Sequence, residues 1–541
     1  MKEFRIFGPP GTGKTTRLAK QTIPAAVERY GPDGVMVVSF TRAAAREIAS
    51  RDIEVEPENV GTLHAICYRA LGRPEIAEAH IDEWNDFCPM FRLSGESGIV
   101  SVDEGIDDPS GNSKTVGDEL LARGNIFRAR MQNEREKWPN GVRAFFARWD
   151  EWKGVTGYID FTDMIEKGLH DIPRAPGDIG VLIVDEAQDL TPLQFALVRS
   201  WGVLMDWIVT VGDDDQTIYS FTGAKAEAFF EPDVPEKYKT VLSQSYRVPR
   251  TVFNRATQLI KRVRKREPKE YYPRGIDGVV EDSYCDCLQA DVISELAEDI
   301  AKRGHTVMVL ASCSYMINPT KQYLSMLGIP FQNAYRRRRR DWNPLYLYQN
   351  GVTGAQLLQS FLNCGPDKPY WNVFDFVKWS KFILVGDNGL VRGVGKKGIK
   401  VLEQAIKDKA QGLHTTREVV SHILSPNALD AALKRDIKWL EKNIAAGKTK
   451  PLQYPLRVLD RYGIDGLQDV PKITVGTIHS VKGGEADVVI LAPDISNAAF
   501  IESMSNSGMD DLIRLFYVGM TRAREKLILL AHSEGSNFIE L

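Results

Sequence analysis

The chain has 541 residues, a length that exceeds one hydrophobic core and predicts roughly three or four domains. Its composition, 43% hydrophobic and 26% charged, is that of an ordinary globular protein and excludes the collagen-like, disordered and disulfide-scaffold classes. A formal net charge of -3 excludes attraction of an anionic polymer by a global positive field, so such a partner must bind local patches.

Cysteine usage and hydropathy predict the compartment. The six cysteines are scattered, and the close pair Cys285 and Cys287 has no second pair at zinc-binding spacing, which predicts reduced thiols. No apolar run reaches the length of a membrane span, and the first strand is expected to begin near Met1, leaving no room for a signal peptide. We therefore expect a cytoplasmic protein with no membrane partner.

The first element is a glycine-rich loop, GPPGTGKTT, between an apolar stretch and residues of helical character. This is the order of a phosphate-binding P-loop, in which backbone N–H groups surround a polyphosphate; a glycine-rich turn with a chance lysine is the alternative. Lys14 is predicted to reach the outer phosphates of a nucleoside triphosphate, and Thr15 to offer its hydroxyl to Mg2+. The predicted ATP-binding residues of the loop are Gly8, Pro9, Pro10, Gly11, Thr12, Gly13, Lys14, Thr15 and Thr16.

The next elements follow from apolar patterning and helix propensity. Residues 35–40 predict a strand, and the alanine-rich residues 41–51 predict a helix. Residues 65–165 are mainly helical in pattern and are interpreted as an insertion, with a long loop expected around 94–118. Four aromatic residues in this region lie at helical spacing and predict a core face: Phe145, Phe146, Trp149 and Trp152.

Two apolar runs end in acidic residues. Residues 181–190 and 207–216 both have this pattern, which is typical of buried parallel strands whose carboxyl ends face a site. A nucleoside triphosphatase needs carboxylates there, because magnesium must be held and an attacking water must lose a proton. We predict that Asp185 orients the Mg2+ shell and that Glu186 is the general base; a surface acid pair is the alternative.

The second half of the chain repeats the alternation of strands and helices. Helical patterning returns between about 346 and 469, and the candidate strands are residues 307–312, 473–480, 486–492 and 526–531. Such alternation favours parallel sheets of the α/β class. The sequence thus predicts two α/β units, each with a mainly helical insertion.

Two arginines are candidates for neutralising the transferring phosphoryl group, because a P-loop with one lysine leaves its developing charge incompletely compensated. Arg247 lies in LSQSYRVPR, and Arg522 lies in FYVGMTRAREKL. Either one alone is as readily interpreted as a solvated surface arginine.

Eight ordered segments resemble the helicase motifs of the UvrD/Rep-type superfamily 1 helicases. They are GPPGTGKTT, VVSFTRAAAREI, GTLHAICYRAL, IVDEAQDLTPLQ, VGDDDQTIYSFTGA, LSQSYRVP, VGTIHSVKGGEADVVIL and LFYVGMTRAREKL. The resemblance implies an α/β fold of two RecA-like P-loop motor domains with parallel sheets, each carrying a mainly helical insertion. It also implies ATP in the cleft between the motor domains and single-stranded DNA across both.

The resemblance further implies a division of the chain. The first motor domain is expected at residues 1–64 and 166–245, with its helical insertion at 65–165. The second is expected at 246–345 and 470–541, with a reduced helical accessory insertion at 346–469. Little chain follows Arg522, so a fused nuclease is not expected.

Functional roles are carried over by the resemblance at matching positions. Gln216 is expected to sense the terminal phosphate, Glu485 to contact the ribose, and Tyr246 to stack on adenine, with a core position as the alternative for Tyr246. Arg247 and Arg522 are expected to be arginine fingers. The predicted catalytic set is therefore Lys14, Glu186, Gln216, Arg247 and Arg522.

The resemblance also implies DNA contacts. Hydroxyls and imidazoles can bond phosphate oxygens without reading sequence, and aromatic faces can stack on any base. The expected partners are single-stranded DNA and duplex junctions. The matching positions are Phe40, Thr41, Thr62, His64, Phe221, Thr477 and His479, among which either histidine alone could equally be an ordinary packed residue.

Some positions depart from the family pattern. Only seven residues precede Gly8, so the upstream glutamine segment that reads adenine in the family is missing from this sequence. Phe221 and Thr222 stand where tryptophan and arginine are common, and Gly484 and Ala486 flank Glu485 where bulkier apolar residues are common. These departures leave nucleobase selectivity open and predict weaker stacking at Phe221.

Five consecutive arginines, Arg336 to Arg340, form the densest basic run in the sequence. A solvated charged face is one interpretation, and a contact with a DNA backbone, which would make the affinity depend on salt, is the hypothesis we favour.

The resemblance of these motifs implies an ATP-dependent single-stranded DNA translocase and DNA helicase with 3'–5' polarity. Two alternatives remain open from the sequence: a motor on RNA or on RNA–DNA hybrids, since none of the expected contacts tests for a 2'-hydroxyl, and an ATP-switched clamp that does not unwind processively.

Overall fold

A computed structural model of the protein describes residues 2–51, 53–95, 115–336, 342–345, 352–363, 370–408 and 415–541. Within these ranges the chain forms two compact units. The first comprises residues 1–287, 310–316 and 477–541, and the second comprises 288–309 and 317–476. Arg337 to Arg340 lie outside the described residues.

The first unit contains a six-stranded sheet with the order β3-β2-β4-β5-β1-β6. All neighbours in this sheet pair in parallel. Its strands are β1 (Lys2–Phe7), β2 (Val35–Ser39), β3 (Val60–Gly61), β4 (Val181–Asp185), β5 (Trp207–Gly212) and β6 (Lys239–Val241). Every residue of β2 and β4 is buried, as expected for a parallel sheet covered on both faces.

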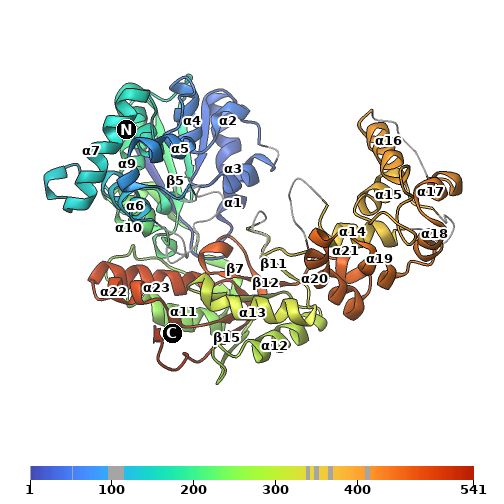
Figure 1. The fold of residues 1–541 in the computed structure, drawn as a ribbon. Helices are drawn as coiled ribbons and strands as arrows, with labels where there is room; N and C mark the ends of the chain where they lie inside the picture. Colours follow the sequence, from blue (N-terminus) through green and yellow to red (C-terminus); the bar gives the residue numbers. More distant parts are fainter. Residues whose placement is uncertain are drawn as a thin grey trace. The chain divides into compact units, whose positions relative to one another are not determined.

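Helices lie on both faces of this sheet (Figure 1). The helix after the P-loop begins as α1 (Lys14–Arg17), passes through one π-helical turn at Leu18–Thr22 and continues as α2 (Ile23–Tyr30). The others that follow strands of the sheet are α3 (Arg42–Ala49), α4 (Leu63–Ala70), α9 (Pro192–Gly202) and α10 (Ala226–Phe230). The strands and helix expected near residues 35–51, 181–190 and 207–216 are present; β4 ends on the first acid of its run, Asp185, whereas β5 ends at Gly212, before its aspartates.

Among the described residues between α4 and β4 there are four α-helices. They are α5 (Ile81–Phe87), α6 (Val116–Ala129), α7 (Asn140–Thr156) and α8 (Phe161–Asp171). The four aromatic residues expected to form a core face are at most 3% exposed and pack with Trp84 and Trp138, which confirms their core role. Most of the expected loop at 94–118 lies outside the described residues, and α6 already begins at Val116.

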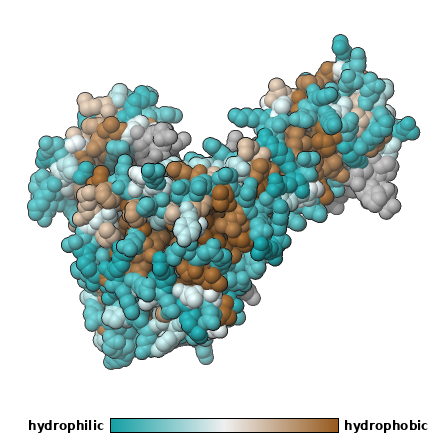
Figure 2. All heavy atoms as spheres, turned by 90° about the horizontal axis from the view of Figure 1, so that it is seen from below, coloured by the Kyte–Doolittle hydropathy of each residue, from teal (hydrophilic) through white to brown (hydrophobic). Residues whose placement is uncertain are grey.

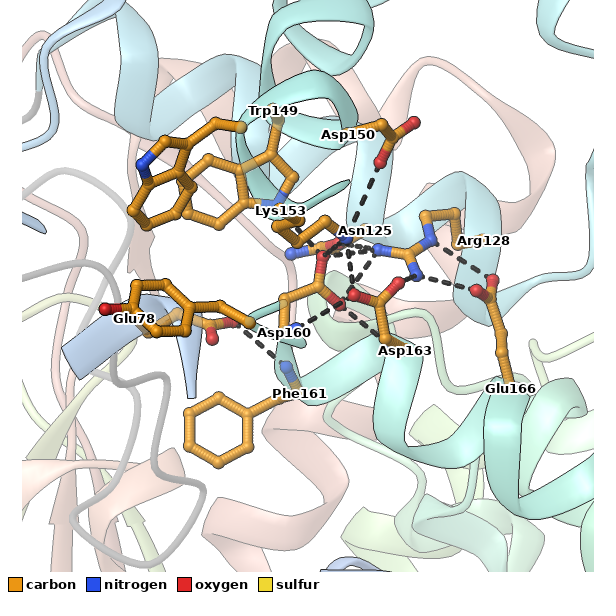
Figure 3. Close-up of polar contacts among 12 residues, drawn as sticks. Glu78, Asn125, Arg128, Trp149, Asp150, Lys153, Asp160, Phe161, Asp163 and Glu166 are labelled. Atoms are coloured by element: carbon orange, nitrogen blue, oxygen red, sulfur yellow. Dashed lines mark hydrogen bonds and ion pairs between the residues drawn. The ribbon is translucent and has the colours of Figure 1, made fainter. Parts of the chain in front are cut away.

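A buried ion cluster joins α6, α7 and α8 (Figure 3). The guanidinium of Arg128 on α6 donates to both oxygens of Asp160 at 3.0 and 2.9 Å and also contacts Asp163 and Glu166. Lys153 on α7 donates to Asp160 at 2.7 Å. Asp160 caps the N-terminus of α8 by accepting from the backbone N–H of Asp163 at 2.7 Å. The cluster therefore fixes three helices through one carboxylate.

A second six-stranded sheet has the order β11-β12-β10-β13-β15-β9. Its strands are β9 (Val279–Asp282), β10 (Val307–Ala311), β11 (Phe331–Gln332), β12 (Ile473–Thr477), β13 (Ala486–Leu491) and β15 (Ala523–Leu529). The pairs β13–β15 and β15–β9 are parallel, as is β11–β12. The expected α/β class with two parallel sheets is thereby confirmed, although β15 begins at Ala523 rather than at the predicted residue 526.

The remaining elements of the first unit surround its C-terminal strands. Helices α11 (Arg250–Ile260), α22 (Asn497–Ser503) and α23 (Asn506–Met520) lie side by side, with α23 packed on both of the others (Figure 1). Two short sheets complete the unit: β7 (Gln244–Pro249) with β8 (Tyr272–Arg274), and β14 (Asp494–Ile495) with β16 (Asn537–Phe538). The five cysteines among the described residues are free thiols.

The second unit is mainly helical. Its described helices are α12 (Ala290–Lys302), all but the first three residues of α13 (Ser314–Leu327), α14 (Gly354–Leu362), α15 (Val373–Ser380), α16 (Gly395–Lys407), α17 (Arg417–Ile423), α18 (Pro426–Leu433), α19 (Ile437–Asn443), α20 (Ala446–Tyr462) and α21 (Asp465–Gln468). Trp371, Trp379 and Phe361 pack together in its interior. Figure 2 shows apolar side chains gathered on the surface of this helical part, where Phe374, Leu384 and Val401 are among the exposed residues.

Across the ranges that the structure describes, no helix is both long enough and apolar enough to cross a bilayer. Arg336, the first of the five arginines, is only 8% exposed, and its backbone carbonyl accepts from the Asn343 side chain at 2.7 Å. The interpretation as a solvated face is therefore wrong for Arg336, and the DNA contact of the run remains a prediction.

Candidate functional site

The P-loop joins β1 to α1 at the carboxyl end of the first sheet. The Gly8 N–H donates to the Gly212 carbonyl at 2.8 Å, which ties the start of the loop to the end of β5. Thr12 closes a turn, because its hydroxyl donates to the Pro9 carbonyl at 2.8 Å. Gly11 has φ of 73°, and a Cβ there would lie 2.5 Å from the Cβ of Arg247, so only glycine fits.

Lys14 is the first residue of α1, and Thr15 and Thr16 follow it in the same turn. The ammonium of Lys14 donates to the Gly8 carbonyl at 2.9 Å and lies 4.0 Å from a carboxylate oxygen of Glu186. The first N–H groups of a helix have no partner within the helix, so the start of α1 is suited to an anion. The loop, the helix start and the lysine therefore converge on one position.

Asp185 and Glu186 lie at the end of β4, beside the P-loop lysine. Asp185 is 1% exposed, and its Oδ1 has no hydrogen-bond partner among the described residues. Burial and the neighbouring Glu186 carboxylate raise the pKa of Asp185 to about 7. A cation next to this carboxylate would offset that cost, so the buried oxygen fits a place in a metal shell.

Glu186 is held differently. Burial alone would raise the pKa of Glu186, but the ammonium groups of Lys14 and Lys482 lower it below its usual value. One of its oxygens accepts a hydrogen bond from the Gln188 amide. Its backbone has φ of 49°, a left-handed conformation that is rare outside glycine. Glu186 is thus an ionised, oriented carboxylate next to the lysine of the P-loop.

The segment around β7 lies directly on the P-loop. The Ser245 hydroxyl and the Tyr271 hydroxyl both donate to the Pro10 carbonyl, at 2.9 and 2.8 Å. The backbone N–H of Tyr246 donates to the Gly11 carbonyl at 2.8 Å. The Tyr246 side chain is 72% exposed, which excludes the alternative of a core position and leaves its ring open to a ligand.

Arg247 and Glu485 form an ion pair in this site. The Arg247 Nε donates to Glu485 Oε2 at 2.7 Å, and Arg524 lies 3.2 Å from the other oxygen of Glu485. The side chain of Arg247 is 15% exposed and that of Glu485 is 41% exposed. The structure therefore brings the proposed finger and the proposed ribose contact together in one pair beside Gly11.

Arg522 is buried and donates to three acceptors. Its guanidinium bonds the Gln216 Oε1 at 3.1 Å, the Gly484 carbonyl at 3.2 Å and the Val518 carbonyl at 2.9 Å. Its positive charge also contributes to lowering the pKa of Glu186. The five residues predicted as catalytic thus lie around one place in the first unit.

An aromatic group surrounds Tyr219 on the same unit. The ring centroid of Tyr219 lies 5.2 Å from that of Phe40, 5.9 Å from that of Phe221 and 6.3 Å from that of His479. Phe221 and His479 also pack edge to face at 5.4 Å. Three of the residues predicted to contact DNA are therefore brought together around a tyrosine to which the sequence analysis assigned no role.

The other predicted DNA contacts have local roles in the fold. The hydroxyls of Thr41 and Thr62 cap α3 and α4 by accepting from backbone N–H groups at 3.0 and 3.2 Å. Thr477 is buried, and its hydroxyl accepts from the Ser480 N–H at 3.2 Å. The His64 ring packs against Phe161, with centroids 6.1 Å apart, and desolvation lowers its pKa to about 4.

Several residues at the site were missed by sequence reasoning. The Lys482 ammonium contacts Asp189 and donates to the Gln216 carbonyl at 2.9 Å; it lies in the quoted segment VGTIHSVKGGE, so its position in a motif could have indicated it. Lys269 and Arg266 contact the aspartates before Gln216, but they lie in a basic run that patterning predicts to be solvated. The only feature of the sequence that could have indicated Lys269 and Arg266 was that their charge is opposite to that of the three aspartates, Asp213 to Asp215.

A glycine loop at a helix start, acids at the end of the adjacent strand and two parallel sheets define a P-loop nucleoside triphosphatase. Comparison with protein families makes this class more specific. Residues 2–234 match the UvrD/REP helicase N-terminal domain, and residues 458–534 match the UvrD-like helicase C-terminal domain. The chain belongs to the UvrD/REP family of superfamily 1 helicases, as the ordered motifs suggested.

Curated relatives align along almost the whole chain. A protein named "Probable DNA helicase II homolog" from Mycoplasma capricolum subsp. capricolum is 21% identical, with 98% of this chain and 82% of the relative covered. Proteins named "ATP-dependent DNA helicase PcrA" are 25% identical in Staphylococcus aureus strain Mu50 and 22% identical in Staphylococcus epidermidis. Both alignments cover 97% of this chain and 80% of the relative.

Proposed function

We propose that the protein is an ATP-dependent DNA helicase and single-stranded DNA translocase that moves with 3'–5' polarity. The observation that carries the proposal is the meeting of Lys14, Glu186 and the Gln216–Arg522 pair at one place. Family membership and the names of the relatives support the choice of DNA as the substrate.

In this proposal each of the two large sheets belongs to one motor domain. Residues 1–64 and 166–245 form the motor domain with the P-loop, and 65–165 its helical insertion. Residues 246–345 and 470–541 form the motor domain with the arginines, and 346–469 a reduced accessory insertion. Since Lys14 and Arg522 belong to different motor domains in this division, bound nucleotide would hold the two together and hydrolysis would release them.

The P-loop residues would bind ATP by its phosphates. Lys14 would exchange the Gly8 carbonyl for the outer phosphates, and the N–H groups at the start of α1 would cradle them. Tyr246, with its exposed ring, would stack on adenine, and Glu485 would turn from Arg247 to the ribose. Arg247 would then no longer pair with Glu485, and its guanidinium could contact the phosphates.

Thr15 and Asp185 would hold Mg2+, which when bound would neutralise phosphate charge. Glu186 would accept a proton from the attacking water, because its lowered pKa keeps it ionised at neutral pH. The water oxygen would bond to the terminal phosphorus as the bond to the bridging oxygen breaks, which leaves ADP and phosphate. Gln216 and Arg522 would contact the terminal phosphate and stabilise the charge that develops.

On the DNA side, Phe221 and Phe40 would supply aromatic faces for bases. The hydroxyls of Thr41, Thr62 and Thr477 would bond phosphate oxygens together with the rings of His64 and His479. Each such contact is independent of sequence, as stepping along a strand requires.

The test is a strand-displacement assay with one duplex that carries either a 3' or a 5' single-stranded tail. We expect ATP-dependent unwinding of the 3'-tailed duplex only, because the tail is the loading strand for 3'–5' movement. Glu186→Gln is expected to abolish turnover while nucleotide binding persists, since the amide keeps the shape but cannot accept the proton. Unwinding from the 5' tail alone would overturn the polarity, and normal turnover by Glu186→Gln would overturn the base.

Two further measurements separate the alternatives. ATPase stimulation is compared between DNA and RNA of the same sequence, and stronger stimulation by RNA would replace the proposal with an RNA motor. Tight ATP-dependent binding of DNA without displacement of either duplex would indicate a clamp.

A further inference from the structure

Three consecutive aspartates lie in the interior of the first unit, directly before Gln216. Asp213, Asp214 and Asp215 follow the end of β5 and are at most 1% exposed. Burial and the charges of its two neighbours raise the pKa of Asp214 to about 6, although Lys269 opposes this shift. Adjacent buried carboxylates are unfavourable unless cations compensate them, so the position of these three depends on their partners.

Lys269 is that partner. Its side chain is 1% exposed, and its ammonium lies 2.9 Å from Asp213 Oδ1 and 3.0 Å from Asp215 Oδ2, with Asp214 in contact as well. The single ammonium therefore forms ion pairs with all three carboxylates and also donates a hydrogen bond to Asp214. Arg266 adds a two-pronged pair with Asp215. Both cations come from the segment between α11 and β8, far in the chain from the aspartates.

The side chain of Asp213 connects Lys269 and the three aspartates to the candidate site. Asp213 uses Oδ1 for Lys269 and Oδ2 for the Gln216 amide, whose Nε2 donates to it at 2.7 Å. Because the amide nitrogen is held in this way, the Gln216 Oε1 points to Arg522, which donates to it at 3.1 Å. The connection therefore runs from Lys269 through Asp213 and Gln216 to Arg522.

We propose that Lys269 is a positioning residue for ATP hydrolysis, which holds Asp213 so that Gln216 is presented to Arg522 and to the terminal phosphate. The inference rests on the proposed function of Gln216 and Arg522. It adds that the segment at residues 261–271, which carries no helicase motif, sets the geometry of the phosphate-sensing loop. Lys269 itself touches neither nucleotide nor water.

The experiment measures DNA-stimulated ATPase kinetics of the full chain. The single variant Lys269→Met leaves the aspartates without their central cation. The double variant Lys269→Met, Asp214→Asn also removes one carboxylate, so the net charge of Lys269 and the aspartates is the same as in the wild type. We expect the double variant to regain most of the lost thermal stability but to keep a kcat about 10- to 100-fold below wild type, with KM for ATP little changed. Lys269→Arg should retain part of the wild-type kcat. Lys261 is an exposed lysine in the same segment, and Lys261→Met should change neither kcat nor thermal stability.

The decisive comparison is a double-mutant cycle with Gln216→Ala. If Lys269 acts through Gln216, adding Gln216→Ala to the Lys269→Met, Asp214→Asn variant should lower kcat no further than Gln216→Ala alone. Full recovery of kcat together with stability, or additive losses in the cycle, would overturn the inference. A normal kcat for Gln216→Ala alone would instead overturn the proposed role of Gln216.

Discussion

At the scale of single residues, Glu186 combines an unfavourable backbone conformation with the proposed role of general base. A left-handed conformation at a residue other than glycine costs about 1–3 kcal/mol and persists only where the surroundings determine it. Here the φ of 49° accompanies contacts with Lys14 and Gln188 that fix the carboxylate. The acid pair was predictable from the sequence, but this conformation was not, because none of the residues nearby demands it.

His64 provides a prediction about pH. Desolvation lowers its pKa to about 4, so its ring is neutral throughout the range around pH 7. We expect His64→Gln to weaken single-stranded DNA binding without altering its dependence on pH between about 5.5 and 7.5, because the native ring does not titrate there. Fluorescence anisotropy across this range measures both properties. A wild-type inflection near pH 6.5 that disappears in the variant would contradict the prediction.

The same shift of the His64 pKa affects stability with a defined sign. The folded pKa lies below the unfolded value, so the unfolded chain binds a proton first as the pH falls. This contribution to stability is therefore complete above about pH 6.5 and is lost progressively as the pH falls toward 4. Urea unfolding of His64→Gln should lack that part of the acid destabilisation.

Phe221 provides a second prediction at this scale. Its ring packs edge to face with His479 and near Tyr219, and it stands where a larger tryptophan is common in the family. We expect Phe221→Ala to cost about 1–3 kcal/mol of single-stranded DNA affinity, and Phe221→Trp to increase affinity. Neither change should alter the salt dependence, since no charge is removed. Titrations at two salt concentrations test this, and an unchanged affinity for Phe221→Ala would exclude stacking at this position.

At the scale of elements, the ion cluster of α6, α7 and α8 makes opposite predictions for Asp160 and for Glu78, a buried carboxyl group beside the cluster that accepts a hydrogen bond from the backbone N–H of Phe161 at 3.1 Å. Burial alone would raise the pKa of Asp160, but Arg128 and Lys153 hold it far below its usual value. Asp160 therefore contributes stability above the pKa of an unfolded aspartate and loses it in acid. Asp160→Asn leaves two buried cations short of a partner and should cost about 3–5 kcal/mol at neutral pH.

The pKa of Glu78 is shifted in the opposite direction to that of Asp160, so its effect on the pH dependence of stability is also opposite. Burial and the charge of Asp160 raise its pKa well above the usual value, so the folded protein keeps a proton that the unfolded chain has lost. Stability should therefore decrease as the pH rises, and Glu78→Gln should remove this decrease and stabilise the protein at alkaline pH. Urea unfolding at pH values of about 6 and 8.5, with exposed Glu136→Gln as a control, measures both variants. Equal pH slopes for Glu78→Gln and wild type would contradict the assignment.

The sequence predicted those strands, loops and helix faces whose conformation is determined by their own residues. The apolar run at Val181–Asp185 and the glycine loop before Lys14 each determine their own conformation, and the aromatic stripe on α7 indicated its buried face. The buried position of Arg336 was not predictable, because a run of identical charges does not reveal which member packs inward. Lys269 was missed for the same reason.

At the scale of the whole molecule, the site is assembled from residues that are distant in the sequence. Gln216 and Arg522 are 306 positions apart, and no periodicity or propensity connects them. Only the order of the motifs, through resemblance to a family, predicted that they belong to one site. Partners outside the motifs, such as Tyr271 on the Pro10 carbonyl, depend on tertiary packing and had no comparable signal.

The net charge of -3 makes a last prediction about DNA binding. With no global attraction, affinity must come from local cations, and Arg337 to Arg340 are the densest such group in the sequence. We expect replacement of these four arginines by glutamine to weaken binding at low salt. The plot of log affinity against log salt concentration should become shallower by about 0.7 for each phosphate that the variant no longer neutralises.

The control for the arginine run replaces the exposed pair Lys302 and Arg303, at the C-terminal end of α12, by glutamine. This removes two cations that already pair with Glu298 and Asp299 of that helix. If only total charge mattered, this control should lower the salt slope in proportion to the number of cations removed. If the run contacts the backbone, only the arginine variant should change it, because counterions are released only by cations that reach phosphates. An unchanged slope for the arginine variant would mean that the run is a solvated face.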